Sequence, residues 1–316
     1  MDTGSRKAVL AAMLANAGIA VAKYVGFAFT GASSMLAEAV HSSADTANQG
    51  LLLWGGTAAQ RPATEQFAFG HGRERFFWCF VVALVIFSLG GLFAIFEGVE
   101  KLRHPHPLQY MGWAVLILGF SVLLESFSFR TALVEANAQK GTDSWLSFIR
   151  GTKNPELPVV LMEDLGALIG LLLALIGVGL AWRLDDPRFD AIGSICIGVL
   201  LVTTGVGLAL KMKGLLIGES ATHADEALIR AALLAAPEVL RVIHMRTQHI
   251  GPEEILLGAK VEFDHGLSMV ALAQAIDAAE LRIRAQVPDT RLIFIEPDLY
   301  RACEHPAAAS KGAGSD

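Results

Sequence analysis

The stretch LPVVLMEDLGALIGLLLALIGVGLAW, residues 157–182, decides how this chain must fold. It is apolar along almost its whole length, and a helix of about 20 such residues crosses a bilayer core about 30 Å thick. A helix satisfies its own backbone polar groups in hydrocarbon, whereas an open strand edge does not. The stretch also carries two adjacent carboxylates, Glu163 and Asp164, which are costly at this depth without a polar partner, a proton or a cation.

The composition of all 316 residues supports a membrane protein, because 53% are hydrophobic, 18% are charged and the mean hydropathy is +0.49. A net charge of -6 removes the electrostatic basis of nucleic-acid binding, so that class of partner is excluded. The three cysteines (Cys79, Cys196 and Cys303) are scattered, which argues against a disulfide framework and against a Cys-x-x-Cys metal site.

Similar apolar stretches recur along the first two thirds of the chain. They predict an all-α bundle of six transmembrane helices, at residues 8–30, 33–58, 76–99, 109–132, 157–182 and 189–210. The N-terminal segment MDTGSRKAVL is expected to begin the first span rather than a removable signal peptide.

The distribution of Lys and Arg predicts the orientation of these spans. Most of the basic residues near span ends fall on one side, at positions 6, 7, 61, 73, 75, 130, 140, 150, 153, 211 and 213. The positive-inside rule makes this side cytoplasmic, so a multi-pass protein with both termini in the cytoplasm is expected.

The composition becomes more polar after residue 218, and a second domain is expected there. Helical segments at 224–236 and 269–286 alternate with strand-like segments at 239–249, 255–264 and 291–295. We expect a small antiparallel sheet with both helices on one face, in a cytoplasmic α+β domain that associates with a second copy. The predicted parts are a transmembrane domain (1–218), a cytoplasmic dimerisation domain (219–303) and a disordered tail (304–316).

The second span contains AEAVHSSADTANQ, residues 37–49, in which His41 and Asp45 lie one helical turn apart on one face. An imidazole and a carboxylate so placed can grip one divalent ion, or these groups only hydrogen-bond one another or line a water-filled crevice. Two other ionisable residues lie within predicted spans. We expect Lys23 to extend its ammonium to the membrane interface, and Glu38 to line the outer route.

Three segments carry a resemblance to a known family. TGASSMLAEAVHSSADTANQGLLLWG (30–55), FAFGHGRERFFW (67–78) and DPRFDAIGSICIGVLL (186–201), with the closing small domain, resemble the cation diffusion facilitator family of metal transporters. FIRGTKNPELPVVLMED (148–164) and IFIEPD (293–298) are similar to the zinc transporter nine-like branch. The resemblance covers nearly the whole chain. It implies a homodimeric exchanger of a divalent metal for protons, with a tetrahedral site between the second and fifth spans and a ferredoxin-like cytoplasmic domain.

The resemblance also implies a ligand set for this site. His41 and Asp45 match the ligand pair of the second span, and Asp164 matches the second ligand of the fifth span. The fifth-span histidine of the family is replaced by Val160, which cannot ligate. Glu163 is the nearest replacement, although neighbouring residues on a helix point about 100° apart. Alternatively, Asn48 or a water molecule completes the coordination shell of the metal ion.

One nitrogen and two or three oxygen ligands suit Zn²⁺ and also accept Co²⁺, Fe²⁺ or Mn²⁺. The expected function is proton-coupled zinc efflux, with protons as counter-ion and membrane lipid and a second copy as partners. The alternative is a membrane-anchored scaffold or metal sensor that acts through the small domain. An enzyme is not expected, since the chain has neither an HExxH helix nor a GxSxG elbow.

Three further residues are candidates for a secondary or peripheral metal site. His71 matches a loop histidine that binds a peripheral ion in some relatives, but the neighbouring ligand positions read Thr64 and Phe67. In the small domain, relatives bind zinc between the domains of two copies. Of the ligand positions in this sequence, Glu296 and Asp298 remain, while two others are occupied by Ile243 and Ala259, which cannot ligate. We therefore expect this domain to serve mainly dimerisation.

Overall fold

The computed structural model describes residues 3–141 and 144–301 and divides the chain into two compact units, Met1–Ile217 and Gly218–Asp316. The tail predicted to be disordered, residues 304–316, and Cys303 lie outside the described residues.

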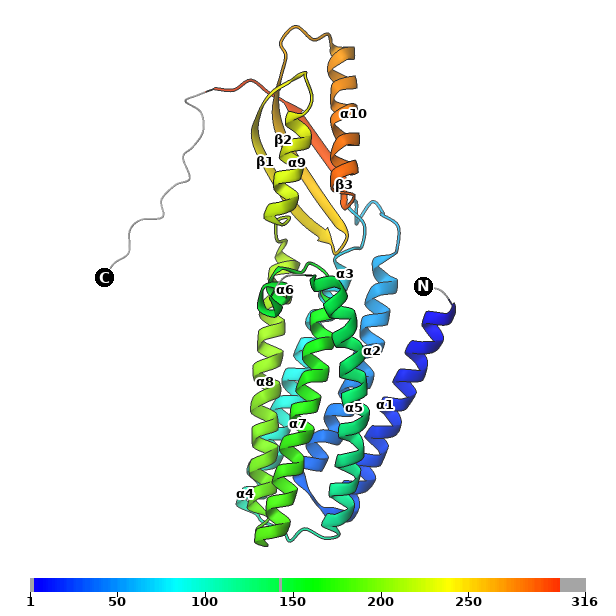
Figure 1. The fold of residues 1–316 in the computed structure, drawn as a ribbon, viewed down its shortest axis with the longest axis vertical. Helices are drawn as coiled ribbons and strands as arrows, with labels where there is room; N and C mark the ends of the chain where they lie inside the picture. The colour runs from blue at the N-terminus through cyan, green and yellow to red at the C-terminus, as the bar shows by residue number, and fades with distance from the viewer. Residues whose placement is uncertain (1–2, 142–143, 302–316) are drawn as a thin grey trace, which may run out of the picture. The chain divides into compact units, whose positions relative to one another are not determined.

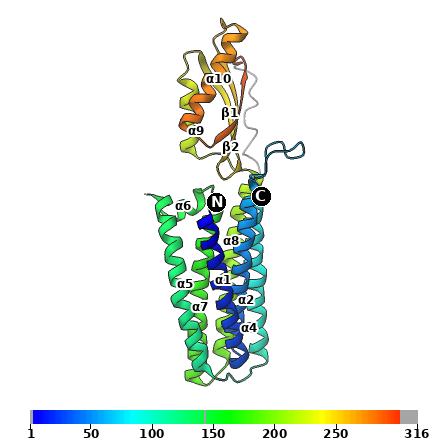
Figure 2. The ribbon, with the colours of Figure 1, turned by 90° about the vertical axis from the view of Figure 1, so that its right-hand side faces the viewer.

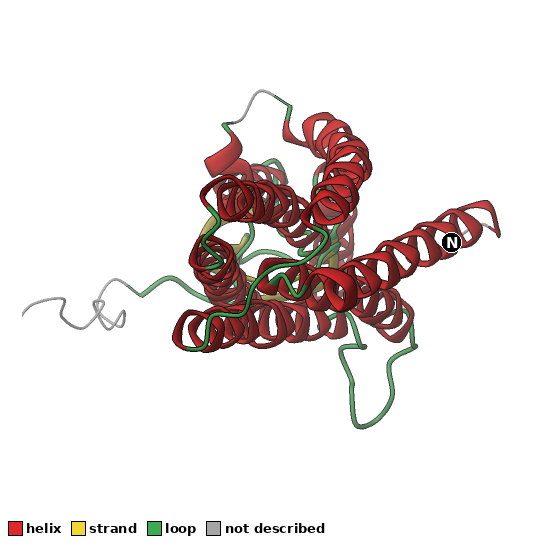
Figure 3. Ribbon diagram, turned by 90° about the horizontal axis from the view of Figure 1, so that it is seen from below, coloured by secondary structure: helices red, strands yellow, loops and turns green. Residues whose placement is uncertain are grey.

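The first unit is helical. Its elements are α1 (Thr3–Thr30), α2 (Ser33–Ala59), α3 (Glu74–Val85), the π-helix η1 (Ile86–Leu92), α4 (Phe93–Arg103), α5 (Met111–Lys140), α6 (Trp145–Gly151), α7 (Glu156–Leu184) and α8 (Arg188–Ile217). The helices α3, η1 and α4 follow one another without a break, so together they form one long helix. The long helices run side by side (Figures 1 and 2), and the view from below in Figure 3 shows α1, at the N-terminus, running obliquely to the others.

Four of the described helices are long and apolar enough to cross a membrane, namely Glu74–Arg103, Met111–Ala138, Glu156–Leu184 and Arg188–Ile217. Their outward-facing side chains fit a lipid environment. On α5, for example, Trp113, Phe120 and Phe127 are 60–72% exposed, which is unfavourable in water and favourable in hydrocarbon. With 28 and 27 residues, α1 and α2 have sufficient length, but they are not among the four. The chain is an integral membrane protein.

Glycines allow α8 to approach the π-helical segment closely. A Cβ added to Gly91 would lie 2.7 Å from the backbone nitrogen of Val202, and one added to Gly198 would lie 2.7 Å from the carbonyl oxygen of Gly91. Real Cβ atoms do not tolerate such distances, so these two helices pack backbone against backbone. Small residues allow this kind of packing in membranes.

The N-terminal turn of α2 is held by Asp190 of α8, which is fully buried. Its Oδ2 accepts hydrogen bonds from the backbone nitrogen (2.7 Å) and hydroxyl (3.0 Å) of Ser33, and its Oδ1 accepts from both groups of Ser34. Lys101 of α4 places its Nζ 3.4 Å from Asp190 and donates to the carbonyl of Gly31. This carboxylate caps free N–H groups at a helix start, and it ties α2 to α4 and α8.

The second unit has the predicted order of elements, with α9 (His223–Leu234), β1 (Val239–Gly251), β2 (Glu254–Phe263), α10 (Met269–Gln286) and β3 (Thr290–Pro297). Apolar side chains of both helices and the sheet share one core. The strand order is β1-β2-β3, with β1 antiparallel and β3 parallel to β2. The expectation of an antiparallel sheet is therefore wrong for β3. The reason is that α10 crosses between β2 and β3 and returns the chain in its original direction.

Candidate metal centre

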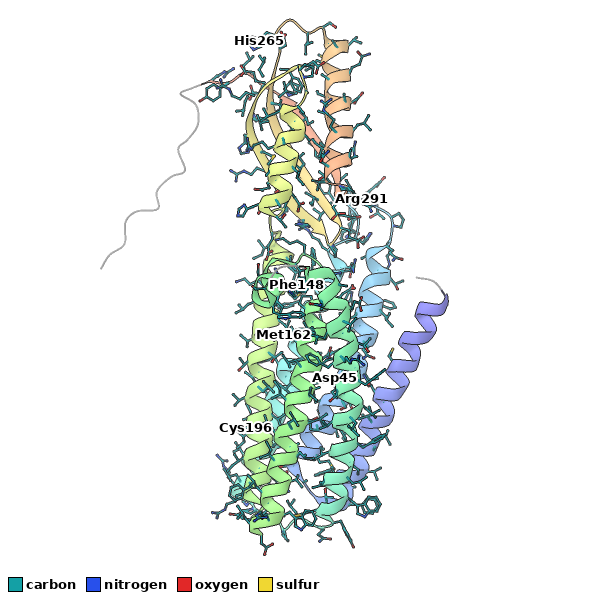
Figure 4. The ribbon with its side chains drawn as sticks, viewed as in Figure 1. Asp45, Phe148, Met162, Cys196, His265 and Arg291 are labelled. Carbon is teal, nitrogen blue, oxygen red and sulfur yellow. The ribbon has the colours of Figure 1, made fainter. Side chains whose placement is uncertain are left out.

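Three polar side chains of α2 share one face because they are spaced by four and three residues. They are His41, Asp45 and Asn48. The side chains of His41 and Asn48 are 1% and 0% exposed, and the Nδ1 atom of His41 lies 3.3 Å from Oδ1 of Asp45. Figure 4 places Asp45 well within the length of the helical bundle, away from both of its ends.

Glu163 of α7 completes this group. The side-chain amide of Asn48 donates a hydrogen bond of 2.7 Å to Oε1 of Glu163, and the carboxyl groups of Asp45 and Glu163 lie within hydrogen-bonding reach of each other. Glu163 is buried. Two carboxyl groups so close together in a dry environment require a proton or a cation between them.

Asp164, the neighbour of Glu163 on α7, has a different hydrogen-bond partner. Its Oδ2 accepts a hydrogen bond of 3.1 Å from the hydroxyl of Ser128 on α5, and it interacts electrostatically with Glu125 of the same helix. The helical rotation of about 100° between neighbours explains why Glu163 faces α2 while Asp164 faces α5. Val160 packs in an apolar cluster with Phe129 and Phe148. The structure thus brings His41, Asp45, Asn48 and Glu163 together, whereas the hydrogen bond of Asp164 goes to Ser128 on α5.

Several polar atoms of this group are buried without a hydrogen-bond partner among the described residues. They are Nε2 of His41 and Oδ1 of Asn48, and Nδ1 of His41 and Oδ1 of Asp45 have no partner among those residues apart from each other, at 3.3 Å. Buried polar atoms are nearly always paired, so these atoms indicate a place that takes up a bound species. One imidazole nitrogen, carboxylate oxygens and an amide oxygen are donors that Zn²⁺ and its neighbours accept.

The described residues contain no cluster in which three His, Cys, Asp or Glu side chains already hold the geometry of a metal site. His41, Asp45 and Glu163 would have to draw together around an ion. Gly90 of η1 lies next to His41, because a Cβ added to it would lie 3.7 Å from Nδ1 of the imidazole. π-helical segments such as η1 often occur at functional sites.

A buried ion pair lies one turn away on α2. Nζ of Lys23 on α1 is 3.0 Å from Oε2 of Glu38, and it donates to the hydroxyl of Ser42 at 2.7 Å. The two charged side chains are 2% and 0% exposed. The expectation that Lys23 extends to the membrane interface is wrong, because an opposite charge on the neighbouring helix holds its ammonium inside the bundle.

The candidates for peripheral sites have other neighbours. The ring of His71 packs against Phe67, with 4.8 Å between centroids. Glu296 and Asp298 both bind the ammonium of Lys260, at 3.0 and 3.1 Å. Hydrogen bonds to these two carboxylates raise the pKa of Lys260, and its hydrogen bond lowers the pKa of Asp298. These carboxylates therefore face a protein cation.

Comparison with known proteins shows what this architecture is similar to. Residues 9–217 match the cation efflux transmembrane domain. The chain is 30% identical over 265 residues to the proton-coupled zinc antiporter SLC30A9, mitochondrial, of Xenopus laevis, and 28% identical over 263 residues to that of Homo sapiens. Both alignments cover 83% of this chain, and they cover 47% and 46% of those relatives.

Two relatives with other names are also similar. The metal tolerance protein C4 of Arabidopsis thaliana is 29% identical over 83% of this chain and 58% of its own length. The cation-efflux pump FieF of Klebsiella pneumoniae is 24% identical over 92% of this chain and 91% of its own length. The chain spans about half the length of the antiporters it matches. Because the family match extends over most of the chain, the protein belongs to the cation efflux family, also called the cation diffusion facilitators.

Proposed function

We propose that this protein is a proton-coupled antiporter of divalent metal cations, with zinc as the exported ion. The observation that carries the proposal is the convergence of His41, Asp45 and Asn48 on α2 with Glu163 on α7, in a buried environment. Relatives named as proton-coupled zinc antiporters support zinc and protons as the exchanged ions.

The donor set explains how metal and protons compete. Metal binding requires the neutral imidazole of His41 and the ionised carboxylates of Asp45 and Glu163. Protons that reach the same groups from the other side of the membrane displace the ion. Movement of α2 relative to α7 would expose the group alternately to each side, and the proton gradient would supply the direction.

Asn48 has a role that its contacts suggest. Its amide nitrogen is engaged by Glu163 while its Oδ1 has no partner among the described residues, so the oxygen is available as a fourth ligand. The ligand set proposed for Zn²⁺ is then His41, Asp45, Asn48 and Glu163, and Co²⁺, Fe²⁺ and Mn²⁺ are alternative ions. Asp164 would act beside this set, through Ser128.

The remaining architecture is proposed along the same lines. The helices α1 and α2 would complete six membrane spans, and residues 1–218 would form the transport domain, with both termini in the cytoplasm. Residues 219–303 would form a ferredoxin-like domain that joins two copies into a homodimer. Its α-β-β-α-β order supports this assignment.

Flux into vesicles tests the proposal. The purified chain is reconstituted in liposomes that contain a zinc-sensitive dye, and a pH step is imposed across the membrane. We expect zinc flux that follows the pH step and that is lost in Asp45→Ala and Glu163→Gln. Absence of proton-dependent flux, or flux unchanged by both substitutions, would refute transport and favour the scaffold or sensor function.

A further inference from the structure

The buried pair of Lys23 and Glu38 lies beside the candidate metal group without being part of it. Glu38 precedes His41 by three residues, so the two side chains are neighbours on the surface of α2. The ammonium of Lys23 also interacts electrostatically with His41 and Asp45. A carboxylate and its counter-charge therefore stand one helical turn from the imidazole.

The second oxygen of Glu38 is directed toward α7. Its Oε1 is buried and has no hydrogen-bond partner among the described residues, and a Cβ added to Gly170 would lie 2.5 Å from it. Gly170 follows Glu163 by seven residues, two turns along the same face of α7. One oxygen of Glu38 is thus held by Lys23, and the other points into the seam between α2 and α7 in which Glu163 lies.

We propose that Lys23 determines the metal selectivity of the site by neutralising Glu38 and keeping it from ligating the transported ion. The inference rests on the proposed function, since it concerns the same site. With Lys23 present, the divalent ion has the four ligands proposed above, from His41, Asp45, Asn48 and Glu163. Without the ammonium, Glu38 would carry an uncompensated buried charge, which is strongly unfavourable, and it would turn to the cation one turn away.

An additional carboxylate changes which ions bind best. Zn²⁺ favours four ligands and accepts nitrogen, whereas Mn²⁺ favours sites rich in oxygen. Removal of the Lys23 charge should therefore shift preference from Zn²⁺ toward Mn²⁺. If the ion pair of Lys23 and Glu38 had only a structural role, its loss would lower stability or flux without changing which of the two metals is preferred.

The experiment compares initial rates of Zn²⁺ and Mn²⁺ entry into vesicles containing the full chain, over a range of ion concentrations at one fixed pH gradient, and derives an apparent KM for each ion. Lys23→Gln keeps a hydrogen-bond donor for Glu38 but removes the charge. It should raise the preference for Mn²⁺ over Zn²⁺ about ten-fold, the size of effect that changes next to a metal's ligands typically have. Lys23→Arg should retain the ratio of the unmodified chain. The double variant Lys23→Gln/Glu38→Gln should restore that ratio, because the released carboxylate is gone.

Two results would overturn the inference. One is an unchanged ratio in an active Lys23→Gln variant, and the other is a shift that persists in the double variant. If Lys23→Gln does not fold, the variant Glu38→Gln tests the same inference. In this variant the unpaired ammonium of Lys23 should weaken the apparent affinity for both ions about ten-fold, with the ratio of the two affinities unchanged. An unchanged affinity would contradict the inference. Absence of metal flux in the unmodified chain would instead refute the proposed function, so the two failures are distinguishable.

Discussion

The amide nitrogen of Asn48 donates a hydrogen bond of 2.7 Å to Oε1 of Glu163, and this contact joins α2 to α7 within the candidate metal group. It orients the Glu163 carboxylate toward Asp45 and leaves the amide oxygen of Asn48 available. The adjacent carboxylate, Asp164, accepts its hydrogen bond from Ser128 of a different helix. Two neighbouring acids on one helix are thereby directed to different surroundings.

This difference predicts unequal effects of two matched substitutions. Glu163→Gln should weaken zinc binding at least as much as removal of a supporting partner does, about ten-fold or more. Asp164→Asn should alter it by much less, because its carboxylate is engaged by Ser128 of α5 and is not among the proposed ligands. Isothermal titration of zinc into the purified full chain measures both. A larger loss in Asp164→Asn than in Glu163→Gln would contradict the proposed ligand set.

Asn48→Asp places a third carboxylate against Glu163 and removes a buried donor. Loss of that donor should lower the free energy of unfolding by about 1–3 kcal/mol in the absence of metal. Zinc should reverse the loss, because a divalent cation neutralises the added charge. Thermal unfolding in detergent, with and without zinc, measures this. Equal destabilisation under both conditions would argue against an ion at this position.

Asp190→Asn should destabilise the chain through the start of α2. The substitution leaves the ammonium of Lys101 buried without its counter-charge, and disruption of a buried pair typically costs about 3–5 kcal/mol. Asp185→Asn is the matched control, since Asp185 is exposed in the turn just before α8, the helix that carries Asp190, and asparagine tolerates its positive φ of 53°. The unfolding temperature should fall in the first variant only. A similar temperature in both variants would show that the capping contacts contribute little.

Zinc should stabilise the folded chain by mass action. At a free concentration one hundred times its Kd, a ligand that binds only the folded state contributes about 2.7 kcal/mol. We expect an upward shift of the unfolding temperature with zinc, reversed by a chelator. The shift should be absent in His41→Ala, in which the only imidazole of the group is removed. An equal shift in that variant would place the stabilising zinc elsewhere in the protein.

Part of the fold could be predicted from sequence because hydrocarbon restricts the choices. Long apolar stretches indicated the helices, and the helix at 269–286 has the predicted bounds. Helices extend past the predicted spans, as α8 does from residue 210 to Ile217, because hydropathy marks the bilayer core and backbone hydrogen bonding continues beyond it. The direction of β3 in the small sheet depends on the crossover through α10. The alternation of apolar and polar residues predicts a strand but not its direction.

The candidate site could be predicted in part. The spacing of His41 and Asp45 places them on one face, but spacing within α7 does not say which of Glu163 and Asp164 turns toward α2. That choice depends on how α7 is rotated against α5 and α2. The pairing of Lys23 with Glu38 had a usable signal, since opposite charges in adjacent spans avoid the cost of burying either one alone. The hydrogen bonds from Ser33 and Ser34 to Asp190 join residues 157 and 156 positions apart, and no local pattern encodes them.

The location of the bound metal is the most direct test. Crystals of the full chain grown with zinc would be measured at the zinc absorption edge. We expect an anomalous peak between α2 and α7, about 2.0–2.2 Å from a ring nitrogen of His41 and from carboxylate oxygens of Asp45 and Glu163. A peak on Asp164 and Ser128 at the α5 side, or no peak within the helical bundle, would contradict the proposed metal centre.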